Sequence, residues 1–371
     1  MHPHNGSVFN LARLLMALLL LLAGCTTTSR RAEPVPDWSQ SSGRTPEPPL
    51  RPATPFPPPQ TAPVPPPAAE ATWISLTRWC AERGMMPPAR LSTSPITTYG
   101  VFTGHGVLAI QIGSPSAWWE NVEVRLGFVP QLTDGQVWLH ALDYRKNIEP
   151  LLRGFTPVTK PGRVIVLDPG HGGGNPGARS VVNGAWEKDY TLDWALRLGP
   201  LLTAQSWQVI LTRTNDVDIP LPARVALAEQ CRADLFLSLH FNSSGGGGNG
   251  TDQAGLETYC LTPTGMPSTL TRGYPDDASL VLPGNAFDEA NVQLAAHLHR
   301  AVLRATGQAD RAVRRARFMT VLQAQRCPAV LIEGGYLSNP KEAQRIADWQ
   351  FRQRLAEAIA GALTTRIEEG R

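Results

Sequence analysis

From Gly162 onward, short apolar runs alternate with longer segments whose apolar residues recur at helical spacing. The runs RVIVLD, WQVILTR, ADLFLSLH and AVLIEGGY are typical of buried strands. Two segments between them, EKDYTLDWALRLGPLLTAQ and LPARVALAEQCR, carry the apolar stripe of amphipathic helices. Strands separated by helices favour a parallel arrangement, so residues 162–367 are predicted to form an α/β domain, a mostly parallel sheet wrapped by helices.

A smaller folded region is predicted before this domain, over residues 71–157. Its first segment, WISLTRWCAERG (residues 73–84), has apolar residues at helical spacing and precedes runs such as VEVRLG that favour strands. We therefore expect a small α+β or mainly β module. His105 and His140 fall in its strand-like runs without clustered carboxylates, so both are interpreted as surface or hydrogen-bonded histidines.

The first 70 residues have a different composition. Arg13 precedes an apolar run that closes with Leu-Ala-Gly-Cys, so residues 1–24 are interpreted as a secretory signal peptide. The closing residues resemble a bacterial lipobox, which makes Cys25 the expected lipidation site and the outer membrane, facing the periplasm, the expected location. An ordinary signal peptide with an incidental cysteine is the alternative. Residues 25–70 include fourteen prolines and are predicted to be an extended linker behind the lipid anchor.

Charge and cysteine content narrow the function classes. The 34 basic and 31 acidic residues give a formal net charge of +3, and no basic and aromatic stripe is present, so no nucleic-acid partner is expected. The remaining cysteines form no Cys-x-x-Cys metal motif, and an exported chain permits disulfides. Pairing therefore stays open for Cys80, Cys231, Cys260 and Cys327.

In the stretch VIVLDPGHGGGNPGA, residues 164–178, an apolar strand runs directly into a glycine-rich loop around His171. The loop lacks the P-loop pattern and a following helix, which disfavours a nucleotide site. A plain turn explains the glycines but leaves His171 unexplained. His240 ends another apolar strand in a similar way, and ligands of parallel sheets bind outside the carboxyl ends of the strands.

Two histidines at strand ends indicate a metal site that needs a third ligand. Glu187 is the favoured candidate because it opens the first helix after the loop, with Asp189 and then Asp193 as alternatives. Glu333 comes at the end of an apolar run, where an unpaired charge is costly, so it is predicted to act as general base and acid beside the metal. This set predicts a hydrolase with one Zn²⁺.

Five ordered stretches over residues 162–367 resemble the zinc-dependent N-acetylmuramoyl-L-alanine amidases of the Amidase_3 family: VLDPGHGGGNPGA, EKDYTLDWALRL, VILTRTNDVDIPLPARVALAE, ADLFLSLHFNSS and VLIEGGYLSNPKEA. The resemblance implies that zinc is bound by His171, Glu187 and His240. It implies that Glu333 is the catalytic carboxylate. It also implies supporting roles for Asp168, Asn242, Arg224 and Arg213.

The reaction implied by the resemblance is hydrolysis of the amide between the lactyl group of N-acetylmuramic acid and L-alanine. Peptidoglycan is then the expected substrate, the cell envelope the expected location, and an activator from the cell wall or the divisome a further partner to test. Residues 71–157 resemble the stalk module at the N-terminus of copper amine oxidases, with DGQVWLHALDYRKNIEPLL as the closing strand and helix. That resemblance implies a scaffold or binding role without chemistry.

An insertion at residues 263–287 is longer than minimal members of the family need, and it is predicted to be a lid or wall of the substrate groove. The tract SSGGGGNG, residues 243–250, is predicted to be a mobile rim. Two alternatives to the amidase stay open. One is a non-catalytic lipoprotein that binds peptidoglycan, and the other is a zinc peptidase that cuts within the stem peptide.

Overall fold

The computed structural model describes residues 72–244 and 252–364. The predicted signal peptide, Cys25, the proline-rich linker and most of the predicted rim lie outside these residues. Within them, no helix combines the length and the apolar character that crossing a membrane requires.

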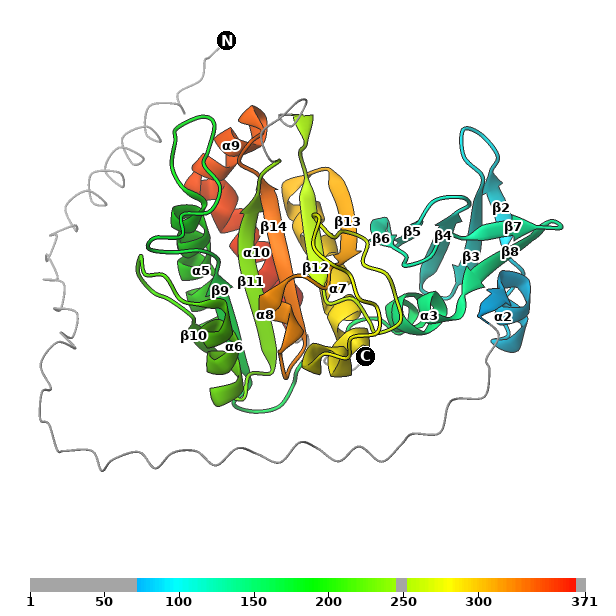
Figure 1. The fold of residues 1–371 in the computed structure, drawn as a ribbon, viewed down its shortest axis with the longest axis horizontal. Coiled ribbons are helices and arrows are strands. Elements are labelled where there is room, and N and C mark those ends of the chain that lie inside the picture. The colour runs from blue at the N-terminus through cyan, green and yellow to red at the C-terminus, as the bar shows by residue number, and fades with distance from the viewer. Residues whose placement is uncertain (1–71, 245–251, 365–371) are drawn as a thin grey trace, which may run out of the picture. The chain divides into compact units, whose positions relative to one another are not determined.

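The N-terminal region contains one small separate sheet, an antiparallel meander that belongs to the larger sheet, and a few short helices (Figure 1). Its elements are β1 (Trp73–Ser75), α2 (Leu76–Glu82), β2 (Ala89–Ser92), β3 (Thr98–Thr103), β4 (Gly106–Gln111), β5 (Ser116–Trp119), β6 (Val122–Arg125), β7 (Gln131–Thr133), β8 (Gln136–His140), α3 (Ala141–Asp143), the π-helical turn η1 (Tyr144–Ile148) and α4 (Glu149–Arg153). Strands β2 to β6 form an antiparallel meander, and β1, β8 and β7 form a separate three-stranded sheet.

The helix predicted over residues 73–84 is shorter than expected. Trp73 to Ser75 form strand β1, which pairs antiparallel with β8, and the helix begins only at Leu76. The Ser75 hydroxyl accepts a hydrogen bond from the backbone N–H of Arg78 and so caps the helix. Pairing with a strand more than sixty residues away outweighs the local helical spacing.

The C-terminal region contains the larger helices (Figure 1). Its elements are β9 (Val164–Pro169), α5 (Glu187–Thr203), β10 (Gln208–Leu211), α6 (Leu221–Gln230), β11 (Leu235–Asn242), β12 (Leu256–Cys260), the 3-10 turn η3 (Pro283–Phe287), α7 (Asp288–Thr306), β13 (Asp310–Arg315), α8 (Thr320–Gln323), β14 (Ala329–Tyr336), α9 (Pro340–Ala347) and α10 (Trp349–Leu363). Strands β10, β9, β11 and β14 are parallel neighbours, whereas β12 runs antiparallel to β14 and parallel to β13. The predicted α/β class with a mostly parallel sheet is confirmed.

The meander of the N-terminal region continues the larger sheet. Strand β13 pairs with β6 at Val313 and Val124, which gives the strand order β10-β9-β11-β14-β12-β13-β6-β5-β4-β3-β2. Buried Arg315 crosses this junction and donates to the side chain of Asn147 at 3.0 Å and to the carbonyl of Lys146 at 2.7 Å. The two regions therefore share backbone pairing and a buried polar contact.

Apolar side chains fill both faces of the parallel strands. On one face, Leu167 and Ile332 pack into a core that includes residues of α5, α7 and α10. On the other face, Val166 and Phe236 pack with residues of α6 and α8. Because both faces are covered, the strands are apolar almost throughout, and their polar residues stand out.

Candidate metal centre

The glycine-rich loop turns sharply after β9 and brings His171 back over the sheet. His171 has a φ of +63°, an uncommon left-handed conformation for a residue with a side chain. The backbones of Gly172 and Asn175 exchange hydrogen bonds of 2.8 and 2.9 Å, which close the turn. The Asn175 side chain lies 3.0 Å from Nδ1 of His171 and fixes the plane of the ring. The next helix begins only at Glu187, so the loop does not present the helix N-terminus of a phosphate site.

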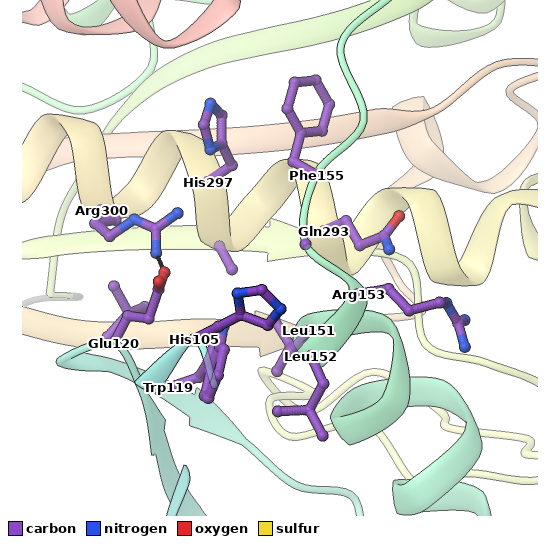
Figure 2. Close-up of a pocket in the computed structure, with 13 residues that line it drawn as sticks. His105, Trp119, Glu120, Leu151, Leu152, Arg153, Phe155, Gln293, His297 and Arg300 are labelled. Atoms are coloured by element: carbon purple, nitrogen blue, oxygen red, sulfur yellow. Dashed lines mark ion pairs between the residues drawn. The ribbon is translucent and has the colours of Figure 1, made fainter. Parts of the chain in front are cut away.

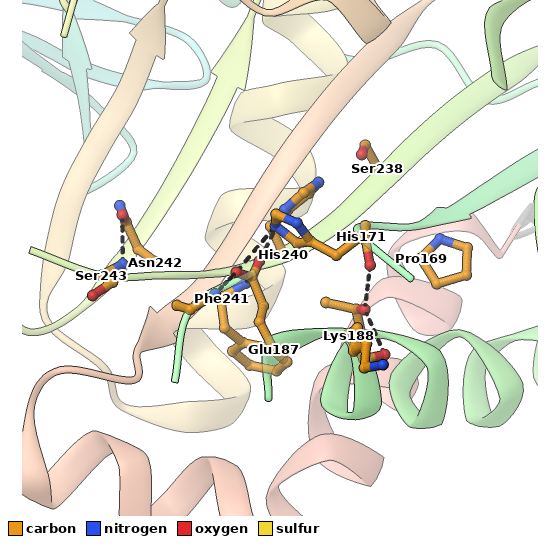
Figure 3. A network of polar contacts seen from close by, with 12 residues as sticks. Pro169, His171, Glu187, Lys188, Ser238, His240, Phe241, Asn242 and Ser243 are labelled. Atoms are coloured by element: carbon orange, nitrogen blue, oxygen red, sulfur yellow. Dashed lines mark hydrogen bonds and ion pairs between the residues drawn. The ribbon is translucent and has the colours of Figure 1, made fainter. Parts of the chain in front are cut away.

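His171, Glu187 and His240 lie together at the carboxyl edge of the sheet (Figure 3). One ligand atom of each lies within 4.8 Å of the others. The Glu187 carboxylate reaches Nε2 of His171 at 3.1 Å and Nδ1 of His240 at 2.9 Å. The histidine side chains are 23% and 17% exposed, so the point between them is open to solvent. The structure thus brings together the three residues that the sequence indicated as ligands.

Two positions of the loop require glycine because neighbouring side chains lie too close to leave room for a Cβ atom. A Cβ on Gly170 would come within 2.2 Å of the His240 ring, and one on Gly177 within 2.6 Å of a Glu187 carboxylate oxygen. Side chains at these positions would occupy the space that the candidate ligands fill. The glycines therefore serve the packing of the cluster as well as the turn.

Glu187 is buried, and its carboxylate is fixed by the backbone. One oxygen accepts from the N–H of Phe241 at 3.1 Å and the other from the N–H of Ala178 at 2.9 Å. Burial alone would raise the pKa of Glu187, but hydrogen bonds and charge from His171 and His240 outweigh burial and lower it. The carboxylate is therefore ionised and oriented, as a metal ligand must be.

A buried polar network lies beneath the His171 loop. Asp168 accepts hydrogen bonds of 2.7 Å from Thr212, Ser238 and Arg224. Arg224 also donates to the carbonyl of His171 at 2.8 Å. These contacts tie the loop to β11 and α6 through fully buried groups.

Arg213 links the loop to the start of α5. Its guanidinium donates to the carbonyl of Gly170 at 2.9 Å and to the carbonyl of Lys188 at 2.8 Å. The segments that carry His171 and Glu187 are therefore held at a fixed separation. Arg224 and Arg213 thus contact the His171 loop directly, Asp168 is joined to it through Arg224, and Arg213 also contacts the start of α5.

Glu333 lies in the middle of β14, not at its end as the sequence reading assumed. It is the register partner of His240 on one side and of Glu257 on the other, so the three side chains leave the same face of the sheet. Glu333 is buried, and its Oε2 has no hydrogen-bond partner among the described residues. Burial and the negative charge of Glu187 raise the pKa of Glu333, and Arg272 opposes them.

Asn242 lies two residues after His240 on β11, and its side chain contacts Glu257 instead of the histidines. Its amide donates to the Glu257 carboxylate at 2.7 Å, and its side-chain oxygen accepts from Arg272 at 3.1 Å. Glu257 and Arg272 were missed by the sequence reading. A charged residue inside the apolar strand segment LETYC was the available signal for Glu257.

The alternative carboxylate ligands have other partners. Asp189 accepts from the backbone N–H of Trp186 at 3.4 Å and caps helix α5. Asp193 pairs with Arg197 and Arg352. Neither belongs to the cluster of potential ligands within the described residues.

The cysteines and a cavity of the N-terminal region lie away from the candidate metal centre. Cys80, Cys231, Cys260 and Cys327 are all unpaired. A cavity of about 310 Å³ lies between the N-terminal region and α7 (Figure 2). Glu120 and Arg300 form an ion pair beside it, and none of the candidate ligands lines it.

Two imidazoles and a carboxylate around a solvent-accessible point are a donor set that suits a catalytic divalent metal ion. The residues present therefore fit one such ion. An α/β sheet that carries this cluster, with a further buried carboxylate on the adjacent strand, is the arrangement expected of a metal-dependent hydrolase.

The chain belongs to the Amidase_3 family, described as N-acetylmuramoyl-L-alanine amidase, whose sequence model matches residues 165–365. Escherichia coli AmiC, an N-acetylmuramoyl-L-alanine amidase, is 31% identical over 253 residues, which cover 62% of this chain and 59% of AmiC. The sporulation-specific N-acetylmuramoyl-L-alanine amidase of Bacillus subtilis is 33% identical over 201 residues, covering 54% of this chain and 66% of that protein.

The catalytic domain of the amidase CwlV from Paenibacillus polymyxa is a similar solved structure. It is 32% identical, with a TM-score of 0.44, and the match covers 54% of this chain and 96% of that domain. The chain thus spans about three-fifths to two-thirds of the two curated relatives described above.

Proposed function

We propose that the protein hydrolyses the amide bond between N-acetylmuramic acid and the L-alanine of the peptidoglycan stem peptide, with one zinc ion held by His171, Glu187 and His240. The observation that carries the proposal is the cluster of these three side chains at the edge of a sheet in a chain of the amidase family. When bound there, zinc supplies a Lewis acid that polarises a carbonyl and lowers the pKa of water.

The chain's own residues supply the rest of the chemistry. Glu333, beside His240, takes a proton from the water that attacks the lactyl carbonyl. As the carbon–nitrogen bond breaks, the same carboxyl gives this proton to the departing nitrogen of alanine. The products are a lactyl carboxylate and a stem peptide with a free amine. The partnerless oxygen of Glu333 supports this role, because a buried acceptor without a donor is costly unless it serves a function.

The supporting residues hold this arrangement before substrate binds. Asp168 and Arg224 fix the loop of His171, and Arg213 fixes that loop against the first turn of α5. Asn242 positions Glu257 and Arg272 beside Glu333. We infer that loss of Asp168, Arg224, Arg213 or Asn242 lowers the affinity for metal or the turnover without removing a ligand.

Mass spectrometry of digested sacculi tests the reaction. The wild-type protein should release intact stem peptides that begin with L-alanine, and Glu333→Gln should reduce release by at least about 100-fold while keeping stoichiometric zinc. Glu289→Gln, at an exposed carboxylate on α7, is the matched control and should keep wild-type activity. Shortened stem peptides would indicate a peptidase, and sacculus binding without products would indicate a non-catalytic lipoprotein.

We also propose that Cys25 is lipidated and tethers the protein to the outer membrane, where it faces the periplasm. The Leu-Ala-Gly-Cys sequence behind an apolar run and the proline-rich segment after it support this location. Metabolic labelling with an alkynyl fatty acid should mark the wild-type protein, and Cys25→Ala should abolish the label and release the protein from membranes. A labelled Cys25→Ala variant would refute the assignment.

The N-terminal region, predicted as a module over residues 71–157, is proposed to act as a scaffold for the amidase region at 162–367. The pairing of β6 with β13 supports a scaffold, as does the bridge from Arg315 to Asn147.

A further inference from the structure

The insertion at residues 263–287, called the wall below, is attached to the rest of the fold by hydrogen bonds. The N–H and hydroxyl of Ser268 both donate to the Asp276 carboxylate at 2.7 Å, and these hydrogen bonds join the two ends of the loop between them. Thr269 and Arg315 exchange two hydrogen bonds of 2.9 Å, so the insertion is attached at Thr269 to the end of β13. Of the two roles predicted from the sequence, lid or wall, these contacts favour the wall.

The tip of the wall is a tight turn in which Arg272 has a backbone conformation that is unfavourable for a residue with a side chain. The N–H of Tyr274 donates to the carbonyl of Thr271 at 2.9 Å, and Arg272 and Gly273 between them have φ angles of +48° and +79°. Two consecutive positive φ angles are the signature of a type I′ turn, which favours Asn, Asp or Gly at the first of these positions. Arginine there costs backbone strain, which persists only where the surrounding structure holds it and is frequent at functional sites. The ring of Tyr274 stacks on Phe318, and this contact packs the turn against the segment that carries Phe318.

The Arg272 side chain points from this turn toward the proposed active site. It donates to the side-chain oxygen of Asn242 at 3.1 Å, and its electrostatic partners are Glu333, Tyr259 and Glu257. No carboxylate of the described residues lies within ion-pair distance of Arg272, in contrast to the other arginines nearby. The residue as a whole is exposed.

The Glu257 carboxylate does not require Arg272 for its neutralisation. Arg311 and Arg314 already contact the Glu257 carboxylate at 3.2 and 3.3 Å. Asn242 and Tyr259 donate to the same carboxylate at 2.7 and 2.8 Å. Arg272 is therefore an exposed cation that is oriented by Asn242 and influenced by the charge of Glu333. It forms no ion pair with Glu257, so N–H donors of its guanidinium are available to a bound substrate.

We propose that Arg272 binds a carboxylate of the stem peptide and makes the enzyme select acidic over amidated stem peptides. This inference rests on the proposed amidase function and adds to it the chemistry of the peptide beyond L-alanine. A guanidinium forms two parallel hydrogen bonds with a carboxylate, which a neutral primary amide cannot match because it has one oxygen acceptor. The strained turn and the Asn242 contact orient the side chain before the substrate arrives, which reduces the entropy lost on binding.

The test uses two synthetic N-acetylmuramoyl tripeptides that differ only at the second amino acid, where one carries a free α-carboxylate and the other a primary amide. Release of the tripeptide is measured with the full-length, zinc-loaded protein. The wild type should show a kcat/KM at least about tenfold higher for the acid, mostly through KM. Arg272→Asn removes the charge and suits the turn better, so it should lose this preference without losing thermal stability. Arg272→Gln should lose the preference as well.

The control Arg326→Asn removes an equally charged, exposed side chain from another part of the surface and should keep the wild-type preference. Equal wild-type rates for the two tripeptides would overturn the proposal and leave the amidase function intact. An unchanged acid preference in Arg272→Asn would also overturn it, as would equal slowing of both substrates, because that is the result of a purely structural role. Failure of the wild type to release peptides from sacculi would instead refute the amidase function.

Discussion

Gly170→Ala should weaken zinc binding while leaving the fold intact. The added Cβ would lie 2.2 Å from Cε1 and 2.3 Å from Nε2 of His240, whereas ordinary contacts begin near 3.4 Å. The imidazole must therefore retreat by about 1 Å, and metal–ligand distances tolerate only about 0.2 Å. Gly170 has no positive φ, so the backbone accepts alanine and the perturbation acts through His240 alone.

The expected loss of zinc affinity is about 10- to 100-fold, the range seen when the surroundings of a metal ligand are disturbed. Overpacking should cost about 1–3 kcal/mol in the free energy of unfolding of the metal-free protein. Gly174→Ala is the matched control in the same loop, because its Cβ meets no atom within 4 Å. Zinc affinity is measured by competition with a chromogenic chelator, and unfolding by urea titration. Equal zinc affinities of the two variants would show that His240 does not depend on this close approach, and the reasoning would be wrong.

Three other perturbations have defined outcomes. Arg224→Met leaves Asp168 buried without its cation and should cost about 3–5 kcal/mol in urea unfolding, partly recovered by adding Asp168→Asn. Burial raises the pKa of Asp143 to about 6, so its stabilising contribution is complete below about pH 4 and lost as pH rises through 6. The difference in unfolding free energy between the wild type and Asp143→Asn should therefore fall by at most about 3 kcal/mol as the pH rises from about 4 through 6. A difference that does not change with pH would contradict the raised pKa of Asp143. A chain truncated to begin at residue 158 strips Arg315 of its acceptors across the junction and should melt at a lower temperature in calorimetry, whereas an unchanged Tm would show that the regions are energetically independent.

The helices and strands of the C-terminal region could be predicted from the sequence because its strands are buried on both faces. A polar residue within or after such an apolar run is conspicuous, and this pointed to His171, His240 and Glu333. The first turn of α5 could be placed from helical spacing, which brought Glu187 to the same edge. Local patterns therefore predicted the candidate ligands and the class of the fold.

What the sequence could not supply depends on contacts between distant segments. Arg272 belongs to an irregular insertion whose path is set by Asp276 and Arg315, so no periodicity placed it near Glu333. The pairing of β6 with β13 joins residues almost two hundred positions apart and has no local signal. Strand β1 was read as helix for the same reason, because its partner β8 lies far along the chain.

The candidate metal centre is organised by the backbone before any metal binds. Each Glu187 oxygen accepts one backbone N–H and contacts one histidine, so its position is determined from the β9 loop and from β11 at once. The histidines come from these same two segments, and Arg213 holds the loop against α5. A displacement of Glu187 must therefore break its contacts to both histidines. The glycines around His171 permit this arrangement by leaving space for His240 and Glu187, which explains why a turn and a metal site share one loop.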